Sequence, residues 1–249
     1  MKSAVYSTLM KSLSIIGFGT FGQFLAPHLT SHFDVYAWNR TNYEAKAKEL
    51  CVSWNTLESA LEKDIIILCT NISFFEAFLK ENSRLINPHA LVIDVASVKI
   101  KPVELMKKYL PSTCEIVGTH PLFGPQSGKN GIEGLNFVVC PVRTSKSDSI
   151  VTFAKEALKL NVILRTPEEH DKEMAYVQGL THFIARALTA MDVKEFVMKT
   201  RAYERLLDIK NFLGGDSWDL FISIENDNPF AKEVREMFKM ELGKLEEKL

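Results

Sequence analysis

The first two thirds of the chain alternate short apolar runs with longer amphipathic stretches. The apolar runs have the length of about 5 residues that is typical of buried strands. They lie at residues 13–17, 33–38, 64–69, 90–94, 115–117, 136–140 and 161–164. Amphipathic segments fill most of the gaps, as at 43–50, 74–79 and 149–160. Strands separated by helices predict an α/β fold with a mostly parallel, doubly wound sheet.

The pattern changes after residue 165. Thr166 can cap a helix, Pro167 suits its first position, and Glu169 completes a capping box. From there on we find no convincing strand. The spacing predicts helices over 168–191, 194–212, 217–224 and 229–248, with a break at Gly214 and Gly215.

We therefore predict two domains, a dinucleotide-binding domain over 1–165 and an all-helical domain over 166–249. A helical domain of this size has a marginal core by itself. Packing against a second copy would enlarge that core, so we expect a homodimer formed through the helical domain.

Composition narrows the function classes. The chain has 249 residues, 46% of them hydrophobic and 24% charged, and a formal net charge of -1. This balance is that of a soluble globular protein and gives no support for nucleic-acid or membrane-surface binding. No apolar run is long enough for a membrane span, and no signal-peptide core precedes the first glycine. Four widely spaced cysteines without a CxxC pair indicate free thiols rather than a zinc site, so we expect a cytoplasmic protein without a metal.

A glycine motif follows the first apolar run. Gly17, Gly19 and Gly22 have the GxGxxG spacing of a dinucleotide-binding turn, with Thr20 and Phe21 between them. The first glycine permits the tight turn, the second admits the pyrophosphate, and the third lets helix and strand pack closely. We assign these five residues to the cofactor, together with Thr70 after the run 64–69. The alternative is a loop with ordinary turn glycines.

The end of the second strand bears on the choice of cofactor. An NAD site usually has Asp or Glu there, whereas this chain has Asn39, Arg40 and Thr41. Arg40 can pair with a 2′-phosphate, which a carboxylate would repel. We therefore favour NADP over NAD. The alternative is that Arg40 is a solvated residue at the start of a helix.

Among six histidines, His120 has the most informative setting. It follows a strand and precedes a stiff loop rich in glycine and proline, whereas the others lie at helix ends, turns or helical faces. The carboxyl ends of strands in a doubly wound sheet face the ligand crevice. A histidine there is a candidate base.

Several motifs carry a family resemblance. They are 94–99 (DVASVK), 118–125 (GTHPLFGP) with Ser127 and Gly128, 169–171 (EHD), Thr181 with His182, and 203–208 (YERLLD). In these motifs the chain resembles the prephenate/arogenate dehydrogenase family, most of all the arogenate dehydrogenases of plants. The resemblance extends over roughly 13–231 and implies a Rossmann domain followed by a helical dimerisation domain.

The resemblance implies oxidative decarboxylation of arogenate or prephenate in tyrosine biosynthesis, with hydride transfer to the nicotinamide. It gives His120 the role of accepting the ring hydroxyl proton, which suits an imidazole with a pKa near ~6.5. It gives Ser97 a hydrogen bond to that histidine or to the substrate hydroxyl. The alternative for Ser97 is the N-cap of the following helix.

The remaining expected contacts concern the substrate. Gln178, His182 and Arg186 are spaced by four, so they share one helical face, and His182 matches a family site residue. The alternative for this face is a solvated stripe. The loop that follows His120 adds three residues that we assign to the substrate, namely Gln126, Lys129 and Asn130.

Two departures from the family leave questions open. Gln126 replaces a glutamate found in many relatives, and 215–220 lacks the arginine that many bacterial members use for a substrate carboxylate. Candidate cations are Arg186, Arg201, Arg205 and Lys129, of which Arg201 and Arg205 read as exposed helical charges. Neutral Gln126 and Asn130 favour prephenate, but the plant-like resemblance favours arogenate. The chain ends without an added segment, so we expect no dedicated tyrosine-sensing domain.

Three other functions are compatible with parts of the sequence. A β-hydroxyacid dehydrogenase or imine reductase would share the architecture, but such enzymes commonly use a lysine in the helical domain or have no histidine in this loop, so segment 119–128 argues against them. A non-catalytic NADP-binding sensor would need neither His120 nor Ser97. A helical interaction module with a relic nucleotide fold fits only the charged segment 239–249.

Overall fold

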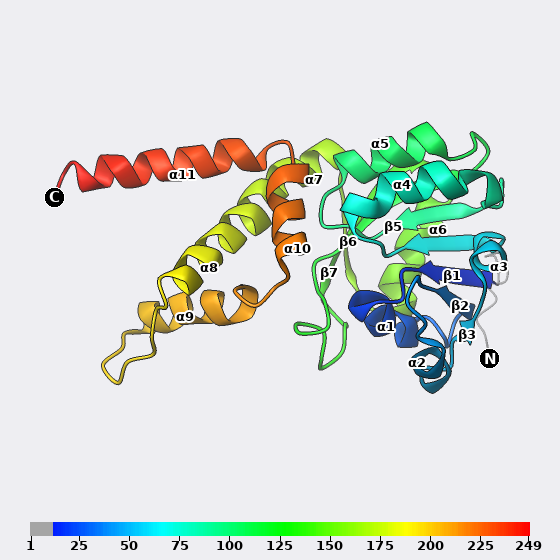
Figure 1. Ribbon diagram of the computed structural model, residues 1–249, viewed down its shortest axis with the longest axis horizontal. Coiled ribbons are helices and arrows are strands. Elements are labelled where there is room, and N and C mark those ends of the chain that lie inside the picture. The colour runs from blue at the N-terminus through cyan, green and yellow to red at the C-terminus, as the bar shows by residue number, and fades with distance from the viewer. Residues whose placement is uncertain (1–11) are drawn as a thin grey trace. The chain divides into compact units, whose positions relative to one another are not determined.

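The computed structural model describes residues 12–249. The chain divides into two compact units, Met1–Pro167 and Glu168–Leu249, each described by itself below (Figure 1). The expectation that no signal peptide precedes the first glycine falls mostly on residues outside the described part. Within residues 12–249, no helix combines the length and the apolar character needed to cross a bilayer. The same residues hold no cluster of three or more side chains suited to bind a metal ion.

The first unit is built on an eight-stranded sheet with the strand order β3-β2-β1-β4-β5-β6-β7-β8. All neighbours are parallel except β6 and β7. The strands are β1 (Ser12–Ile16), β2 (Asp34–Trp38), β3 (Ser53–Trp54), β4 (Ile65–Leu68), β5 (Leu91–Asp94), β6 (Glu115–Pro121), β7 (Asn136–Arg143) and β8 (Asn161–Leu164). Its first six strands have the order of a Rossmann fold, so the predicted fold class is confirmed. The two-residue β3 was not predicted, because it is too short to show a period.

Alternate residues of the central strands face two separate cores. Ile66 and Leu68 belong to a core closed by α3 (Leu57–Leu61), α4 (Ile72–Asn82) and α5 (Ile100–Tyr109). Ile65 and Ile67 belong to the opposite core. That core is covered by α1 (Thr20–Leu25), η2 (Ala26–His28), α2 (Glu44–Glu49), α6 (Ser147–Thr152) and the π-helical η4 (Phe153–Ala157). Figure 1 shows α4 and α5 on one side of the sheet and α1 on the other. A short 3-10 turn, η3 (Ser83–Leu85), follows α4.

The strand before the candidate base is longer than predicted. The apolar run ends at residue 117, yet β6 continues to Pro121. Antiparallel pairing with β7 extends it, and His120 lies opposite Val138. The prediction that His120 follows the strand is therefore wrong, since His120 is the second-last residue of β6. The cause is a tertiary pairing that propensity does not encode.

The second unit is all-helical. Helix continues from Pro167 to Ala190 as α7 (Pro167–Met174), the π-helical η5 (Ala175–Leu180) and α8 (Thr181–Ala190). It is followed by α9 (Arg201–Leu213), α10 (Trp218–Ile222), the π-helical η6 (Ser223–Asp227) and α11 (Ala231–Glu246). Helix α9 ends where Gly214 was predicted to break it.

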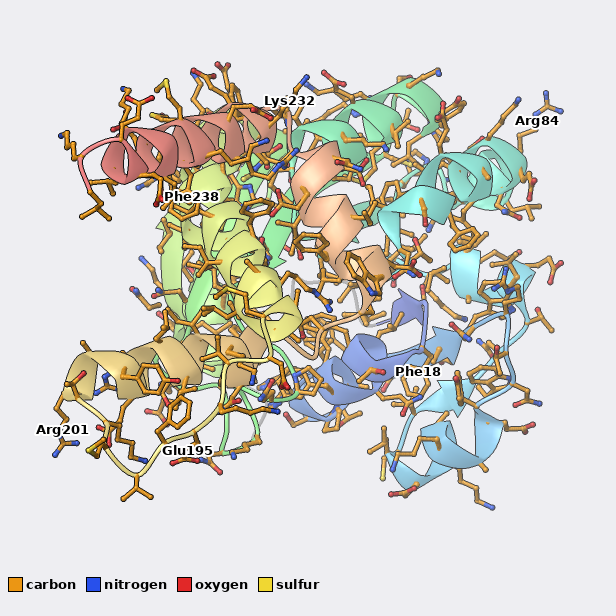
Figure 2. All side chains as sticks on the ribbon, turned by 60° about the vertical axis from the view of Figure 1, so that its left-hand side comes forward. Phe18, Arg84, Glu195, Arg201, Lys232 and Phe238 are labelled. Atoms are coloured by element: carbon orange, nitrogen blue, oxygen red, sulfur yellow. The ribbon has the colours of Figure 1, made fainter. Side chains whose placement is uncertain are left out.

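The predicted helix over 194–212 begins too early. Helix α9 starts at Arg201, because the Thr200 hydroxyl accepts a hydrogen bond from the Tyr203 N–H, 3.2 Å away, and caps it. Figure 2 shows the side chains of Glu195 and Arg201 in this part of the second unit. Arg201 is 98% exposed and pairs with Glu204 at 3.3 Å. Arg205 is also exposed and pairs with Asp208 at 3.2 Å, so both arginines read as surface charges.

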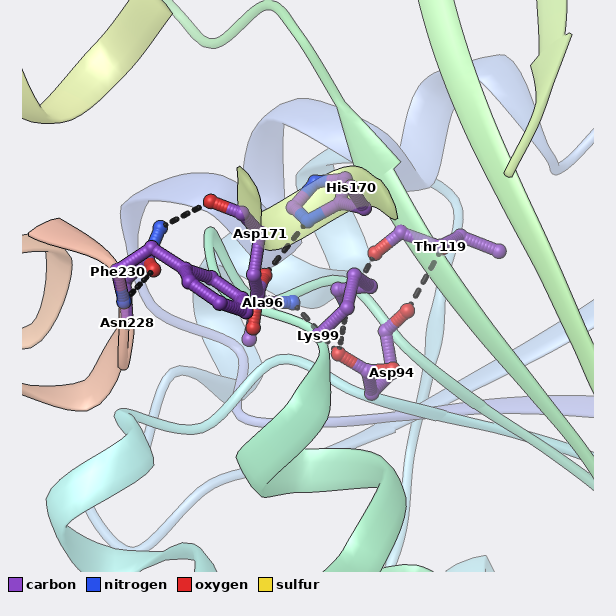
Figure 3. A network of polar contacts seen from close by, with 8 residues as sticks. All are labelled: Asp94, Ala96, Lys99, Thr119, His170, Asp171, Asn228 and Phe230. Carbon is purple, nitrogen blue, oxygen red and sulfur yellow. Dashed lines mark hydrogen bonds and ion pairs between the residues drawn. The ribbon is translucent and has the colours of Figure 1, made fainter. Parts of the chain in front are cut away.

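A buried polar contact ties the start of the second unit to its last helix. His170 Nδ1 lies 2.8 Å from Asp171 Oδ1, and both side chains have no exposed surface. The side-chain amide of Asn228 donates to the Asp171 carbonyl at 2.8 Å, and Asn228 Oδ1 accepts from the Phe230 N–H (Figure 3). Asn228 thus joins α7 to the segment just before α11, and His170 is a buried side chain paired with Asp171 rather than a group of a charged helical surface.

Candidate active site

The glycine turn after β1 leaves open space at one position only. Gly17 has φ +100°, and a Cβ there would lie 2.7 Å from the Cys69 carbonyl. A Cβ on Gly22 would lie 2.4 Å from the Gly17 carbonyl oxygen, whereas one on Gly19 would meet nothing within 4 Å. Gly17 and Gly22 thus serve the turn and the packing of α1. Only Gly19 leaves the backbone open to a ligand, as a pyrophosphate requires.

Thr70 lies next to this turn. Its backbone nitrogen is 3.1 Å from the position of a Cβ on Gly17. The Thr70 hydroxyl is buried and has no hydrogen-bond partner among residues 12–249. A buried hydroxyl without a partner is costly, so this group is suited to meet a polar ligand. The glycine turn and Thr70 therefore fit a dinucleotide.

Burial, reinforced by Asp94, raises the pKa of the neighbouring Cys69 thiol, which stays protonated.

The end of β2 presents a cationic edge. Asn39 and Arg40 directly follow β2, and the Asn39 amide donates to the Thr41 carbonyl at 3.1 Å. The Arg40 guanidinium lies 5.4 Å from the centre of the Phe74 ring in the first turn of α4. Phe74 is 52% exposed. Arg40 is thus an exposed cation resting on an aromatic ring, and the three predicted residues lie together.

The two candidate catalytic residues lie at the carboxyl ends of neighbouring strands. His120 is 4% exposed, near the end of β6. Ser97 lies in the turn between β5 and α5. The N-cap of α5 is Lys99, so the alternative role of Ser97 as its cap is not what the structure shows.

A buried network of charge links these strand ends, and sequence reasoning missed it (Figure 3). Lys99 and Asp94 form an ion pair whose side chains have no exposed surface. Lys99 Nζ also donates to the Thr119 carbonyl at 2.6 Å, and the Thr119 hydroxyl donates to the Asp94 carbonyl at 2.7 Å. The available signal was an acid and a base flanking Ser97 within one motif.

The loop after β6 carries three predicted substrate residues, all exposed: Gln126, Lys129 and Asn130. Gly128 anchors this loop, since a Cβ there would lie 2.5 Å from the Phe24 ring of α1. Ser127 Oγ accepts a hydrogen bond from the Gly124 N–H at 2.9 Å. The loop backbone is thus held within the first unit, and the three side chains point into solvent.

In the second unit, Gln178, His182 and Arg186 each contain a buried polar atom without a hydrogen-bond partner among the described residues. These atoms are Gln178 Oε1, His182 Nδ1 and Arg186 Nε. The solvated-stripe alternative is not what the structure shows, since His182 is 4% exposed. Gln178 lies in the π-helical η5, a form that often occurs at functional sites.

Arg186 is engaged by the turn between α9 and α10. Its guanidinium donates to the carbonyls of Gly214, at 3.1 Å, and Asp216. It also lies 4.8 Å from the centre of the Trp218 ring. These contacts give Arg186 the task of shaping the 214–218 turn. Its direct contact with substrate stays a prediction.

The same turn brings Asp216 to His182, another residue pair that sequence reasoning missed. Asp216 Oδ2 lies 3.7 Å from His182 Nδ1, and the Asp216 side chain is 31% exposed. Burial lowers the pKa of His182; Asp216 opposes this shift and Arg186 adds to it. A carboxylate that directly follows two glycines was the signal available in the sequence.

The chain is similar to known proteins over its whole length. The family model described as prephenate dehydrogenase, nucleotide-binding domain, matches residues 31–164. A relative named arogenate dehydrogenase 2, chloroplastic, from Arabidopsis thaliana is 31% identical over 100% of this chain and 73% of its own length. The chain belongs to the prephenate/arogenate dehydrogenase family. The predicted resemblance, plant-type members included, is confirmed.

Further matches extend the family assignment over the second unit. A model described as TYRAAT1-like, C-terminal domain, matches residues 187–249. Arogenate dehydrogenase 1, chloroplastic, from Arabidopsis thaliana is 34% identical over 95% of this chain, which spans only 39% of that protein. The A. aeolicus prephenate dehydrogenase, solved in complex with hydroxyphenyl propionate and NAD+, has a TM-score of 0.77 and 23% identity, covering 97% of this chain and 91% of its own. That likeness shows the shared fold.

Proposed function

We propose that this family member oxidatively decarboxylates arogenate, and to a lesser extent prephenate, in tyrosine biosynthesis, with NADP as hydride acceptor. The observation that carries the proposal is His120, a buried imidazole at the carboxyl end of β6 in a chain of this family. Rival readings as a sensor or an interaction module assign no task to His120.

The chemistry divides simply between protein and cofactor. The cofactor, when bound, accepts the hydride from the ring carbon that carries the hydroxyl. The imidazole of His120 takes the hydroxyl proton, and Ser97 orients that hydroxyl or the imidazole. The opposite ring carbon loses carbon dioxide, whose bonding electrons complete the aromatic ring, and the proton returns to the phenolate oxygen. The residues of the chain place the substrate and move one proton, because aromatisation drives the loss of carbon dioxide.

The preference for arogenate rests on Asp216. Arogenate differs from prephenate by an ammonium in place of a keto group. Asp216 provides a carboxylate beside His182, a predicted substrate residue. An ammonium can pair with this group, whereas a keto oxygen would repel it. The sequence alone left this choice open, because the neutral Gln126 and Asn130 favoured prephenate whereas the plant-like resemblance favoured arogenate.

The preference for NADP rests on Arg40. Its guanidinium is exposed at the end of β2 and steadied by the Phe74 ring. Residues 38–42 contain no carboxylate that would repel a 2′-phosphate. Gly17 and Gly19 form the turn that would receive the pyrophosphate, Thr20, Phe21 and Gly22 begin α1 directly after it, and Thr70 lies next to it. NAD is the alternative cofactor, to be compared in the same assay.

A homodimer through the second unit is supported by its uncovered apolar side chains. Contiguous exposed apolar side chains mark interaction surfaces, and the second unit leaves many large apolar side chains exposed. They include Met191, Phe196, Val197, Met198, Phe212, Trp218, Ile222, Met237, Met240, Leu242 and Leu245. Light scattering should give twice the 28.2 kDa chain mass. A monomer at micromolar concentration would reject the dimer.

A cytoplasmic location stays part of this proposal. All four cysteines are free thiols, which fits a reducing compartment. The two plant relatives are named chloroplastic, so imaging of a tagged protein in its own cells is the measurement that decides.

Formation of NADPH with arogenate and with prephenate tests the function directly, for the wild type and for His120→Asn. We expect wild-type turnover and a fall in kcat of about 10²-fold or more in the variant, as for loss of a general base. Absence of turnover with both substrates would reject the function. A variant with near-normal kcat would remove His120 from the mechanism.

A further inference from the structure

The buried pair Asp94 and Lys99 closes a ring of contacts between the ends of β5 and β6 (Figure 3). Asp94 Oδ1 accepts from Lys99 and from the Ala96 N–H, the latter at 3.0 Å. Lys99 holds the Thr119 carbonyl, and the Thr119 hydroxyl holds the Asp94 carbonyl. Two of these links are internal to segment 94–99, and the two made by Thr119 join that segment to the strand that carries His120.

A buried ion pair is an unfavourable way to hold two strands together, because both ions lose their hydration. Removing both charges from water costs free energy that their attraction does not always restore, and a pair of apolar side chains of similar volume is often as stable or more so. The neighbouring chain leaves room for it: a Cβ on Gly118 would come within 3.3 Å of both Asp94 Oδ2 and Lys99 Cδ. We therefore look for a function of the Asp94–Lys99 pair other than stabilising the fold.

The ring of contacts holds the backbone next to both candidate catalytic residues. Ser97 sits between Ala96, held by Asp94, and Lys99, which reaches across to β6. His120 directly follows Thr119, which is held through both its carbonyl and its hydroxyl. The backbone on either side of Ser97, and the residue before His120, thus belong to one rigid unit.

We propose that Lys99, with Asp94 and Thr119, is a positioning residue that fixes Ser97 and His120 relative to one another for proton transfer. The proposal rests on the proposed function, since it assigns a task to the geometry of those two side chains. A shift of about 1 Å at reacting groups can lower a rate about 10²-fold. Loss of the network should therefore act on kcat, while the glycine turn keeps its cofactor.

Two variants test the network and one serves as control. Thr119→Val removes the hydroxyl link and keeps the ion pair. Asp94→Asn combined with Lys99→Met removes both charges, so no buried charge is left unpaired. The control is Arg143→Leu, because Arg143 donates to the carbonyls of Cys114, at 2.8 Å, and Pro111, at 2.7 Å, near the start of the same strand β6.

We expect kcat to fall about 10²-fold in the double variant and about 10-fold in Thr119→Val, with the KM for NADP unchanged. The control should keep its kcat. Normal kcat in a folded double variant would overturn the proposal. So would equal losses of kcat, cofactor affinity and melting temperature in all three variants, since this would show a structural role alone.

A second measurement is independent of turnover. In protein labelled with ¹⁵N-histidine, the His120 imidazole signals are identified by their loss in His120→Asn. These signals should move in Thr119→Val and stay in place in Arg143→Leu. Unmoved signals in both would overturn the positioning role. Failure of wild-type turnover, by contrast, would reject the proposed function and leave this measurement standing.

Discussion

Asp216 contacts two predicted substrate residues at once: its carboxylate lies 3.7 Å from His182 Nδ1, and its main-chain carbonyl accepts a hydrogen bond from Arg186. The arginine thereby sets the turn that presents the carboxylate. Two residues that share a helical face and one residue from a distant turn form a single cluster within the second unit.

The first prediction concerns substrate choice. Asp216→Asn keeps the size of the side chain and removes its charge, so arogenate loses a partner for its ammonium. Charged hydrogen bonds contribute about 1.5–3 kcal/mol, so kcat/KM for arogenate should fall roughly 10- to 100-fold. The kcat/KM for prephenate should hold or rise. Equal changes for both substrates would show that Asp216 does not recognise the ammonium. Asp219→Asn in the same segment is the matched control.

The second prediction concerns pH. Burial lowers the pKa of His182, so the unfolded chain binds its proton more readily than the folded protein. The stability contributed by neutral His182 is complete above the unfolded pKa of about 6.5 and is lost as pH falls towards the folded value. Urea unfolding at pH 7.5 and pH 5.5 should show a smaller loss of stability on acidification in His182→Gln than in the wild type. An identical loss would contradict the account.

A variant of Asp216 tests the same pH effect in a second way. It opposes the lowering of the His182 pKa, so Asp216→Asn should make protonated His182 less favourable in the folded state. Acidification should then destabilise Asp216→Asn more than the wild type. A smaller effect would mean that the carboxylate does not act on His182.

The third prediction separates two glycines of one motif. Gly19→Ala places a methyl group where nothing lies within 4 Å, so the melting temperature should stay near that of the wild type. Cofactor affinity should fall, because the methyl group occupies the space left for the pyrophosphate. Gly22→Ala instead meets the Gly17 carbonyl at 2.4 Å and should lower the melting temperature. Calorimetry with and without NADP checks both; normal cofactor binding by Gly19→Ala would remove this turn from the cofactor site.

The fourth prediction concerns the 2′-phosphate. Arg40→Ala should reduce kcat/KM for NADP roughly 10- to 100-fold, by loss of a charged hydrogen bond. The value for NAD should change little. Phe74→Leu keeps the charge and removes the ring beneath it, so it should give a smaller loss. Parallel losses for the two cofactors would exclude Arg40 as the discriminating group.

Much of the first unit could be predicted because its signals are local. Apolar runs such as 64–69 mark strands buried on both faces, and the spacing of Gly17, Gly19 and Gly22 marks the turn. The predicted helix over 168–191 matches the continuous helix from Pro167 to Ala190 for the same reason. In contrast, the start of α9 depended on a cap at Thr200 that competed with a continuing apolar pattern.

The sequence by itself determined most of the strands and helices, the glycine turn and the family, because each of these signals lies in short stretches of neighbouring residues. Only the tertiary structure decided that His120 lies within a strand, that Lys99 reaches Thr119, and that Asp216 meets His182. Lys99 and Thr119, and likewise His182 and Asp216, lie 20 or more residues apart in the chain. Periodicity reports which way a side chain faces, whereas its partner is set by how distant segments pack.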